Sequence, residues 1–300
     1  MPPEVGKAAS LGVLSVHFEG GRCRVRCPFC YLGQRSGASD EAAPLSGLDG
    51  IDLGLVETAL RTLSYRELAV TLSEPIEPVL EPLGRLVRVA GERGLLAAVT
   101  TTLAVSQQLP DAALAGVGRL NLSVDPWKGQ VAAPKGSVEA ADVATALANL
   151  RRRSQAELVL IVTLSTQRFA EELLEKDGLL GALLALPDVD RVALNALKPP
   201  PPWCDRAFWL RTTARLGPLL RQHLDRRLFL DCYVAARILG LGDCPARPDL
   251  SPAPGAGAGG VAFRSCVYQP APDFVAGTSD ELADRLRAFT VPAVCPFPIR

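Results

Sequence analysis

The sequence predicts an α/β protein in which mostly apolar strands alternate with amphipathic helices. Six strand–helix alternations fill residues 11–196, and the strand segments at 67–72, 95–101 and 157–164 are rich in Leu, Val and Ala. Strands of this kind are typical of a parallel sheet that helices cover. An open doubly wound sheet and a full or partial barrel both fit the alternation, so periodicity leaves the architecture open.

Local signals define the individual elements. Asp52 is expected to cap a helix that runs to about Leu63. Leucines at helical spacing, beginning with Leu80 and Leu83, predict a second helix over 78–92. The other expected strands are 11–18, 119–125, 189–196 and 227–231, and the other expected helices are 139–152, 168–185 and 206–224.

The pattern breaks at a run of four prolines, residues 199–202, which predicts a stiff, extended connector. Residues 1–198 are therefore expected to form the α/β domain and residues 199–300 a C-terminal extension. The extension is expected to be irregular, and its segment 245–260, rich in Pro, Gly and Ala, is expected to be a loop.

Composition excludes several functional classes. The 300 residues are 48% hydrophobic, and 32 basic side chains balance 32 acidic ones, so the formal net charge is zero. This balance disfavours wholesale disorder and gives no basic footprint for nucleic acid. Residues 1–10 have no apolar core of a signal peptide, and no apolar stretch is long enough to span a bilayer. We expect a soluble, cytoplasmic protein with neither a membrane nor a nucleic acid as partner.

The eight cysteines need a chemical reason, because clustered thiols in a reducing compartment are more often metal ligands or redox groups than disulfides. Cys23, Cys27 and Cys30 lie within eight residues, at x3 and x2 spacing, directly after the first expected strand. Three thiolates on one loop can hold three corners of a cubane iron–sulfur cluster and leave the fourth iron open. The arginines interleaved with them favour the thiolate form.

A zinc site is the main alternative for this segment. Structural zinc sites usually combine two paired C-x2-4-C units, which close a tetrahedron around the metal. No second pair is nearby, and neither His17 nor His223 has a zinc-finger spacing. Zinc is therefore disfavoured but stays open, and chance clustering is disfavoured further.

The C-x3-C-x2-C segment, with Phe29 just before its third cysteine, resembles the signature of the radical S-adenosylmethionine (SAM) superfamily. The resemblance covers roughly residues 11–198 and implies a partial (β/α)6 TIM-like barrel, which the six alternations fit. It also implies that Cys23, Cys27 and Cys30 bind a [4Fe–4S] cluster whose fourth iron is chelated by SAM. Reduction of that cluster would cleave SAM to a 5′-deoxyadenosyl radical, which abstracts a substrate hydrogen.

The same resemblance implies cofactor-binding roles for further residues. Phe29 would lie near the adenine. Residues 72–75, at the end of the second expected strand, resemble a Gly-Gly-Glu-Pro element that binds the methionyl ammonium. Here Leu72 and Ser73 replace the glycines, and Glu74 keeps the carboxylate for a charge-assisted hydrogen bond. From the residues alone, Glu74 before a proline also fits an ordinary helix start.

Polar residues at the other strand ends are further candidates. Ser123 and Asp125 resemble the polar pair that contacts the methionyl group or the ribose, although Asp125 before Pro126 also fits a simple turn. Weaker candidates at the ends of neighbouring strands are Thr100, Thr101, Thr102, Thr163, Ser165 and Asn195.

Four cysteines follow the expected barrel. The arrangement of Cys232, Cys244 and Cys266 loosely resembles the SPASM or twitch extensions of radical SAM enzymes, which implies at most one auxiliary iron–sulfur cluster. Scattered buried thiols explain these cysteines equally well. Whether Cys295 is a ligand stays open, and Cys204, beside Trp203, is expected to be structural.

The leading hypothesis is therefore a radical SAM enzyme acting on a peptide or a small molecule. The resemblance implies an electron donor such as flavodoxin or ferredoxin. The alternatives are a non-catalytic zinc- or iron–sulfur-binding module, and a degenerate family member whose cofactor pocket no longer works.

Overall fold

The computed structural model describes residues 12–17, 52–72, 76–124, 140–173, 178–197, 202–223, 227–230, 248–252, 260–266, 269 and 271–289. These residues divide into two compact units. Unit 1 holds the described residues between 12 and 99 together with those from 248 to 289, and unit 2 holds those from 100 to 230. The expected boundary after residue 198 falls in the segment 198–201, outside the described residues, and stays a prediction.

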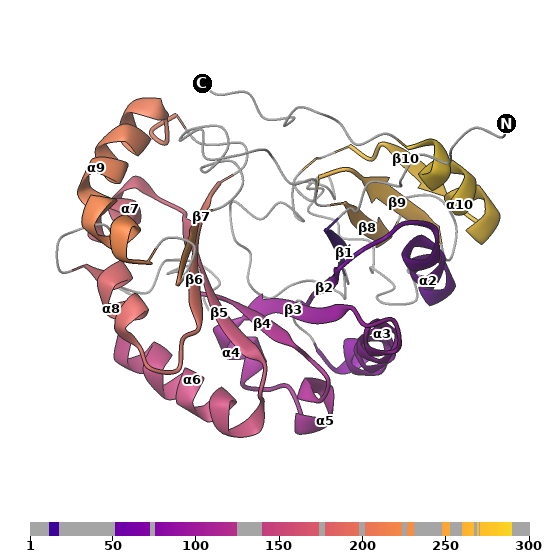
Figure 1. The fold of residues 1–300 in the computed structure, drawn as a ribbon, viewed down its shortest axis with the longest axis horizontal. Coiled ribbons are helices and arrows are strands. Elements are labelled where there is room, and N and C mark those ends of the chain that lie inside the picture. Colours follow the sequence, from indigo (N-terminus) through magenta and orange to yellow (C-terminus); the bar gives the residue numbers. More distant parts are fainter. Residues whose placement is uncertain are drawn as a thin grey trace, which may run out of the picture. The chain divides into compact units, whose positions relative to one another are not determined.

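Unit 1 is a mixed sheet with helices on one face (Figure 1). Its strands are β1 (Val13–His17), β2 (Glu67–Thr71), the start of β3 (Leu96–Thr102), β8 (Asp249–Pro252), β9 (Val261–Arg264) and β10 (Phe274–Ala276), in the order β10-β9-β8-β1-β2-β3. Its helices are α2 (Leu53–Thr62), the 3-10 turn η2 (Glu77–Val79), α3 (Leu80–Glu92) and α10 (Ser279–Ala288). Strand β1 runs parallel to both β2 and β8, whereas β9 is antiparallel to β8 and to β10.

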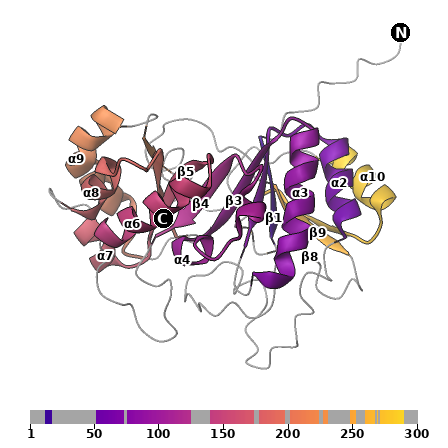
Figure 2. The same ribbon diagram turned by 90° about the horizontal axis from the view of Figure 1, so that it is seen from below.

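The helices of unit 1 cover the apolar face of this sheet, and both views show α2, α3 and α10 on the same side (Figure 2). Leu14, Val16, Leu68 and Phe263 are fully buried. Helix α2 begins as the sequence predicts, because the Asp52 carboxylate accepts a 2.8 Å hydrogen bond from the Gly54 N–H.

The expectation of an irregular C-terminal extension is wrong, because the structure contains three strands and a helix between residues 249 and 288. The strands have only four, four and three residues, which is too short for a strand period to show in the sequence. Their order comes from pairing: β8 adds to the free edge of β1, and β9 and β10 follow. The Phe263 ring stacks on Phe274 with a centroid distance of 4.8 Å and meets the Phe289 ring edge-on at 4.9 Å.

Unit 2 contains the end of β3 and the parallel strands β4 (Arg119–Ser123), β5 (Glu157–Leu164), β6 (Arg191–Ala196) and β7 (Leu228–Leu230). Its helices are α4 (Leu103–Ser106), α5 (Asp111–Leu114), α6 (Ala140–Arg153), α7 (Gln167–Leu173), α8 (Leu179–Ala185) and α9 (Arg206–His223). The buried side chains of β4 to β6 include Leu120, Leu122, Leu158, Leu160, Val162, Val192 and Leu194. The predicted α/β class with a parallel sheet is therefore confirmed.

One detail of unit 2 differs from expectation. The structure describes two helices, α7 and α8, within the helix expected over 168–185, and α8 starts after Gly178, whose extended backbone caps it.

Two of the three arginines that end α6 bond to other parts of unit 2. Arg151 donates to the Ala156 and Asp188 carbonyls and pairs with Asp190, and Arg153 pairs with Asp111. In the part of the chain that the structure describes, no helix is both long and apolar enough to cross a membrane.

Candidate functional site

The two motifs that carry the predicted cofactor site follow neighbouring parallel strands. In β1 and β2 the residues are in register, and the last pair is His17 opposite Thr71. Parallel strands have their carboxyl ends at the same edge of the sheet, about 4.8 Å apart. The sequence runs from His17 to Cys23 in six residues and from Thr71 to Glu74 in three. The strands that precede the two motifs in the sequence thus end at the same edge of unit 1. The motif residues Cys23, Cys27, Phe29, Cys30, Ser73 and Glu74 themselves lie outside the described residues.

The face of the unit 1 sheet opposite to its helices is polar, and we call Ser15, His17, Ser251 and Arg264 the polar face of unit 1. Side chains alternate along each strand, so these residues lie opposite the apolar face that carries Val16 and Phe263. All four are buried, with exposed fractions between 1% and 8%. The Arg264 guanidinium donates a 2.6 Å hydrogen bond to the Ser251 hydroxyl. A buried positive charge therefore lies on this face of the sheet, at the level of Asp249 and Ser15.

Sequence reasoning missed this polar face. The sequence singles out His17 only as a possible zinc ligand, and Arg264 and Ser251 belong to strands that the sequence does not predict. Ser251 and Arg264 join this face only through strand pairing, because β8 and β9 bring residues from position 249 onward beside β1.

Unit 2 has an equivalent polar surface. The residues of β4, β5 and β6 that alternate with the buried leucines include Asn121, Ser123, Thr163 and Asn195, which we call the polar face of unit 2. Thr163 and Asn195 are direct register partners, and the Asn121 side-chain amide donates a 3.1 Å hydrogen bond to the Thr100 hydroxyl. Ser123 ends β4 and is buried. Ligands of parallel α/β sheets usually bind at the carboxyl ends of the strands, where Ser123, Thr163 and Asn195 lie.

The structure therefore brings several predicted polar residues of unit 2 onto one sheet face. Ser123, Thr163 and Asn195 share that face, with Thr100 bonded to Asn121 at its β3 side. Thr101 does not join them, because it is buried on the alternate side of β3 and its hydroxyl has no hydrogen bond. Thr102 caps α4 by accepting from the Val105 N–H. Asp125 lies outside the described residues.

A charged cluster lies at the amino ends of the same strands. Glu157 pairs with Arg119 at 2.7 Å and also with Arg191, whose guanidinium lies 4.9 Å from the centre of the Phe229 ring. The two carboxylate oxygens of Glu157 thus each pair with one arginine, and the cluster joins β4, β5 and β6 at their amino ends. The carboxyl ends of these strands carry uncharged hydroxyl and amide groups instead.

One predicted C-terminal metal ligand is described. Cys266 lies two residues after the end of β9, and its carbonyl accepts a 2.9 Å hydrogen bond from the Gln269 N–H. Asp273 holds this turn, because its carboxylate accepts from the Ser265 N–H and from the Gln269 side chain. Cys204 is buried, as expected. Cys232, Cys244 and Cys295 lie outside the described residues. Among the described residues, no three His, Cys, Asp or Glu side chains group as a metal site.

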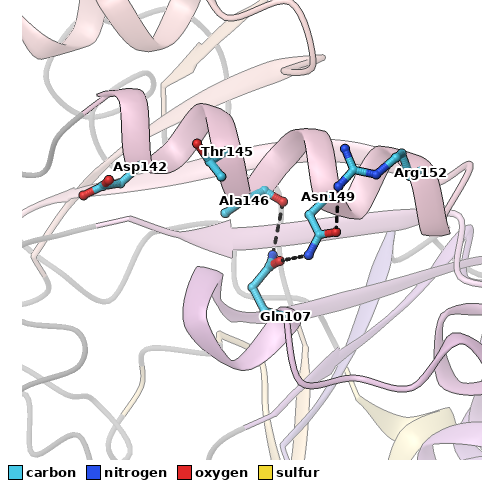
Figure 3. Close-up of a pocket in the computed structure, with 6 residues that line it drawn as sticks. All are labelled: Gln107, Asp142, Thr145, Ala146, Asn149 and Arg152. Atoms are coloured by element: carbon cyan, nitrogen blue, oxygen red, sulfur yellow. Dashed lines mark hydrogen bonds between the residues drawn. The ribbon is translucent and has the colours of Figure 1, made fainter.

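A hollow in the described surface lies elsewhere, against helix α6 (Figure 3). It has a volume of about 510 Å³ and is lined by Gln107, Asp142, Thr145, Ala146, Asn149 and Arg152. Gln107 donates to the Ala146 carbonyl and accepts from Asn149, which in turn accepts from Arg152. This network fastens α4 to α6 on the helical side of unit 2. It does not reach the carboxyl ends of the strands, so we do not assign it to the predicted chemistry.

Two ionisable groups have shifted pKa values for structural reasons. Burial raises the pKa of the Tyr65 phenol, so Tyr65 stays neutral. Partial burial of Asp190 favours its neutral form. The hydrogen bonds from Arg151 and from the Leu158 N–H, with the charges of Arg151 and Arg227, outweigh it and lower the Asp190 pKa.

No family model matches the chain, and no curated protein matches its sequence. Among solved structures, coproporphyrinogen III oxidase (HemN) from Escherichia coli, described as a radical SAM enzyme, has a TM-score of 0.41 and 12% sequence identity. That similarity covers 70% of this chain and 53% of the other, so the chain spans about half the length of that enzyme. A GH113 β-1,4-mannanase has a TM-score of 0.40 and 10% identity over 74% of this chain and 71% of its own. Similarities this low do not assign the chain to a family.

Proposed function

We propose that the protein is a radical SAM enzyme that holds a [4Fe–4S] cluster on Cys23, Cys27 and Cys30. One observation carries the proposal: the strands that precede the C-x3-C-x2-C segment and the segment with Glu74 in the sequence, β1 and β2, are parallel neighbours whose last residues, His17 and Thr71, are register partners. A cluster site on the first segment and an ammonium site on the second would draw on this shared strand edge.

The finer fold in this proposal is a partial (β/α)6 barrel. Two features of the described units support it. The parallel strands β1 and β2 of unit 1 and β4 to β7 of unit 2 pair in chain order, and each sheet has one face of buried apolar side chains and one face that carries polar side chains. In barrels of this class, helices cover the outside of the strands, and functional groups lie at the carboxyl ends.

The donor set of the cysteine segment fits a cluster with one open iron. Three thiolates at x3 and x2 spacing supply three ligands, and the segment offers no fourth cysteine. When bound, such a cluster supplies the electron that cleaves SAM to a 5′-deoxyadenosyl radical, which takes a hydrogen from the substrate. The substrate class is a peptide or a small molecule.

The chain's own residues would bind and orient SAM. Glu74 would accept a charge-assisted hydrogen bond from the methionyl ammonium, and Ser73 would offer its backbone beside it. Ser123 and Asp125 would contact the methionyl group or the ribose, and Phe29 would pack near the adenine.

An auxiliary cluster on Cys232, Cys244 and Cys266 is part of the proposal. Its support is the turn at Cys266, which three hydrogen bonds through Gln269 and Asp273 hold in place. A ligand on a fixed turn loses little conformational freedom when it binds a metal. A substrate-oxidising or peptide-modifying reaction would use such a second cluster.

Iron and sulfide content per chain tests the cluster assignment. The anaerobically prepared protein should contain about four irons with one cluster and about eight with two. Cys27→Ala should abolish the first set, Cys266→Ala should remove only the second, and Cys204→Ala is the matched control that should leave both. Stoichiometric zinc in colourless protein would overturn the proposal and favour the metal-binding module.

The Glu74 assignment has a separate test. In cluster-loaded protein, Glu74→Gln should weaken SAM binding at least tenfold in equilibrium dialysis, because it removes the negative charge and keeps the size. Iron content should not change. Unchanged SAM affinity would contradict the role of Glu74, and a binding module without SAM chemistry would show no affinity in either protein. A reduced flavodoxin or ferredoxin is the proposed electron donor.

A further inference from the structure

Helix α9 (Arg206–His223) presents an unusual concentration of one charge. Its 18 residues include Arg206, Arg211, Arg215 and Arg221, which we call the α9 basic face, and no Asp or Glu. All four arginines are exposed. Leu210, with 53% of its surface exposed, lies among them.

In three other described helices an arginine pairs with a glutamate one turn away. Arg61 pairs with Glu57 in α2, Arg168 with Glu172 in α7, and Arg285 with Glu281 in α10. Among the described residues, no ion pair involves any member of the α9 basic face.

One acidic side chain, Glu171, shares a hollow with two arginines of this surface. It lines a small hollow with Phe208, Arg211, Thr212 and Arg215. Its carboxylate accepts a 2.9 Å hydrogen bond from Gln167, and no ion pair joins it to either arginine in the described part of the chain. The positive charge of the α9 basic face is therefore not neutralised from α7.

Helix energetics do not account for three of these four positions. Arg206 lies in the first turn of α9, where the helix dipole disfavours a positive charge. Arg211 and Arg215 are one turn apart, and like charges at that spacing destabilise a helix. Only Arg221, in the last turn, is placed where the dipole favours it. Arginines that destabilise the isolated helix are explained when an oppositely charged partner binds to them.

We propose that the α9 basic face is a docking surface for an acidic protein. Arginine beside exposed apolar surface is characteristic of protein interfaces, and here Leu210 and Ala214 lie among the arginines. Complementary charge steers such a partner and fixes its orientation. A nucleic acid is the less fitting occupant, because the whole chain has a formal net charge of zero. This inference does not depend on the cluster chemistry.

The test uses the full chain and defined probes. A fluorescent 20-residue oligoglutamate, an oligoglutamine of the same length and a 20-nucleotide single-stranded RNA are titrated at low and at physiological salt. The test variant is Arg211→Glu with Arg215→Glu. The matched control is Arg88→Glu with Arg93→Glu, which makes the same charge change at exposed arginines of α3 and its C-cap.

The proposal predicts that wild type binds oligoglutamate and not oligoglutamine, and that higher salt weakens the binding. The α9 double variant should lose at least tenfold in affinity, while the α3 control stays within twofold. Equal losses in both variants, no oligoglutamate binding, or tighter RNA binding lost in the same variant would each overturn it.

A second measurement separates docking from folding. Arg211→Glu alone creates a favourable Glu–Arg pair one turn apart with Arg215, so Tm should not fall while oligoglutamate affinity does. A fall in Tm with unchanged affinity would show a structural role for Arg211 instead.

Discussion

His17 and Thr71 lie opposite each other at the carboxyl ends of β1 and β2, as the last register pair of two parallel strands. Five residues separate His17 from Cys23 in the sequence, and two separate Thr71 from Glu74. The pairing places the two strands that precede the motifs in the sequence side by side, and the proposed joint site rests on it.

Substitutions on the two faces of the unit 2 sheet should have different effects, on SAM binding for one face and on stability for the other. Ser123 and Leu122 are neighbours in β4 and point to opposite faces. Ser123→Ala should weaken SAM binding by cluster-loaded protein several-fold and cost about 1 kcal/mol or less of stability. Leu122→Ala should instead lower the free energy of unfolding by about 2–5 kcal/mol, because it leaves a cavity under the helices.

Equilibrium dialysis with SAM and urea unfolding measure these two effects on the same preparations. If Ser123→Ala destabilised the fold as much as Leu122→Ala, with no change in SAM affinity, Ser123 would be a core residue and not part of a ligand site.

The hydrogen bond between Arg264 and Ser251 should contribute measurably to the free energy of unfolding. Ser251→Ala removes the hydroxyl that accepts the 2.6 Å hydrogen bond of a buried guanidinium. Hydrogen bonds to charged groups contribute about 1.5–3 kcal/mol, so the free energy of unfolding should fall by that amount. Thr145→Ala, at an exposed position of α6, is the control and should change stability by less than about 0.5 kcal/mol. Equal effects of the two variants would refute the role of the bond.

Most of the fold was predictable because its signals are local. Strand β5 was expected at the residues where it occurs, since eight consecutive positions carry an apolar strand pattern. The cap at Asp52 was predictable because capping needs only a few neighbouring residues. The strands β8 to β10 were not, because they are short and exist through pairing with a segment more than 200 residues earlier.

A substitution in the aromatic cluster of unit 1 should show how much the short strands β9 and β10 contribute to the free energy of unfolding. Phe263 is fully buried and contacts the rings of Phe274 and Phe289. Phe263→Ala should lower the free energy of unfolding by about 3–5 kcal/mol. Val275→Ala, on the exposed side of β10, should change it by less than about 0.5 kcal/mol. Unfolding in urea compares the two, and a small effect at Phe263 would mean that β9 adds little to the core.

Asp190 should make the stability of unit 2 depend on pH. Its folded-state pKa lies below the usual value, so the folded state holds fewer protons than the unfolded state near pH 4. The Asp190 contribution is therefore complete above about pH 5 and is lost as pH falls through the lowered pKa. Asp190→Asn should be less stable than wild type at pH 7, and the difference should shrink towards pH 3. A difference that stayed constant with pH would contradict the charged pairing with Arg151.

The candidate site was predictable only in part. The cysteine spacing and the polar residues at strand ends are visible in the sequence, and the structure joins Thr163 and Asn195 as register partners. Which of those residues share a face is set by register and alternation, so Thr101 could not be separated from Thr100 beforehand. Arg264 enters through strand pairing alone.

The most direct test of the account is the release of 5′-deoxyadenosine from SAM by anaerobic, dithionite-reduced protein. The account predicts that wild type and the Cys204→Ala control release this nucleoside and that Cys27→Ala releases none. Protein that contains a full [4Fe–4S] cluster yet leaves SAM intact, or a Cys27→Ala variant as active as wild type, would contradict the central claim.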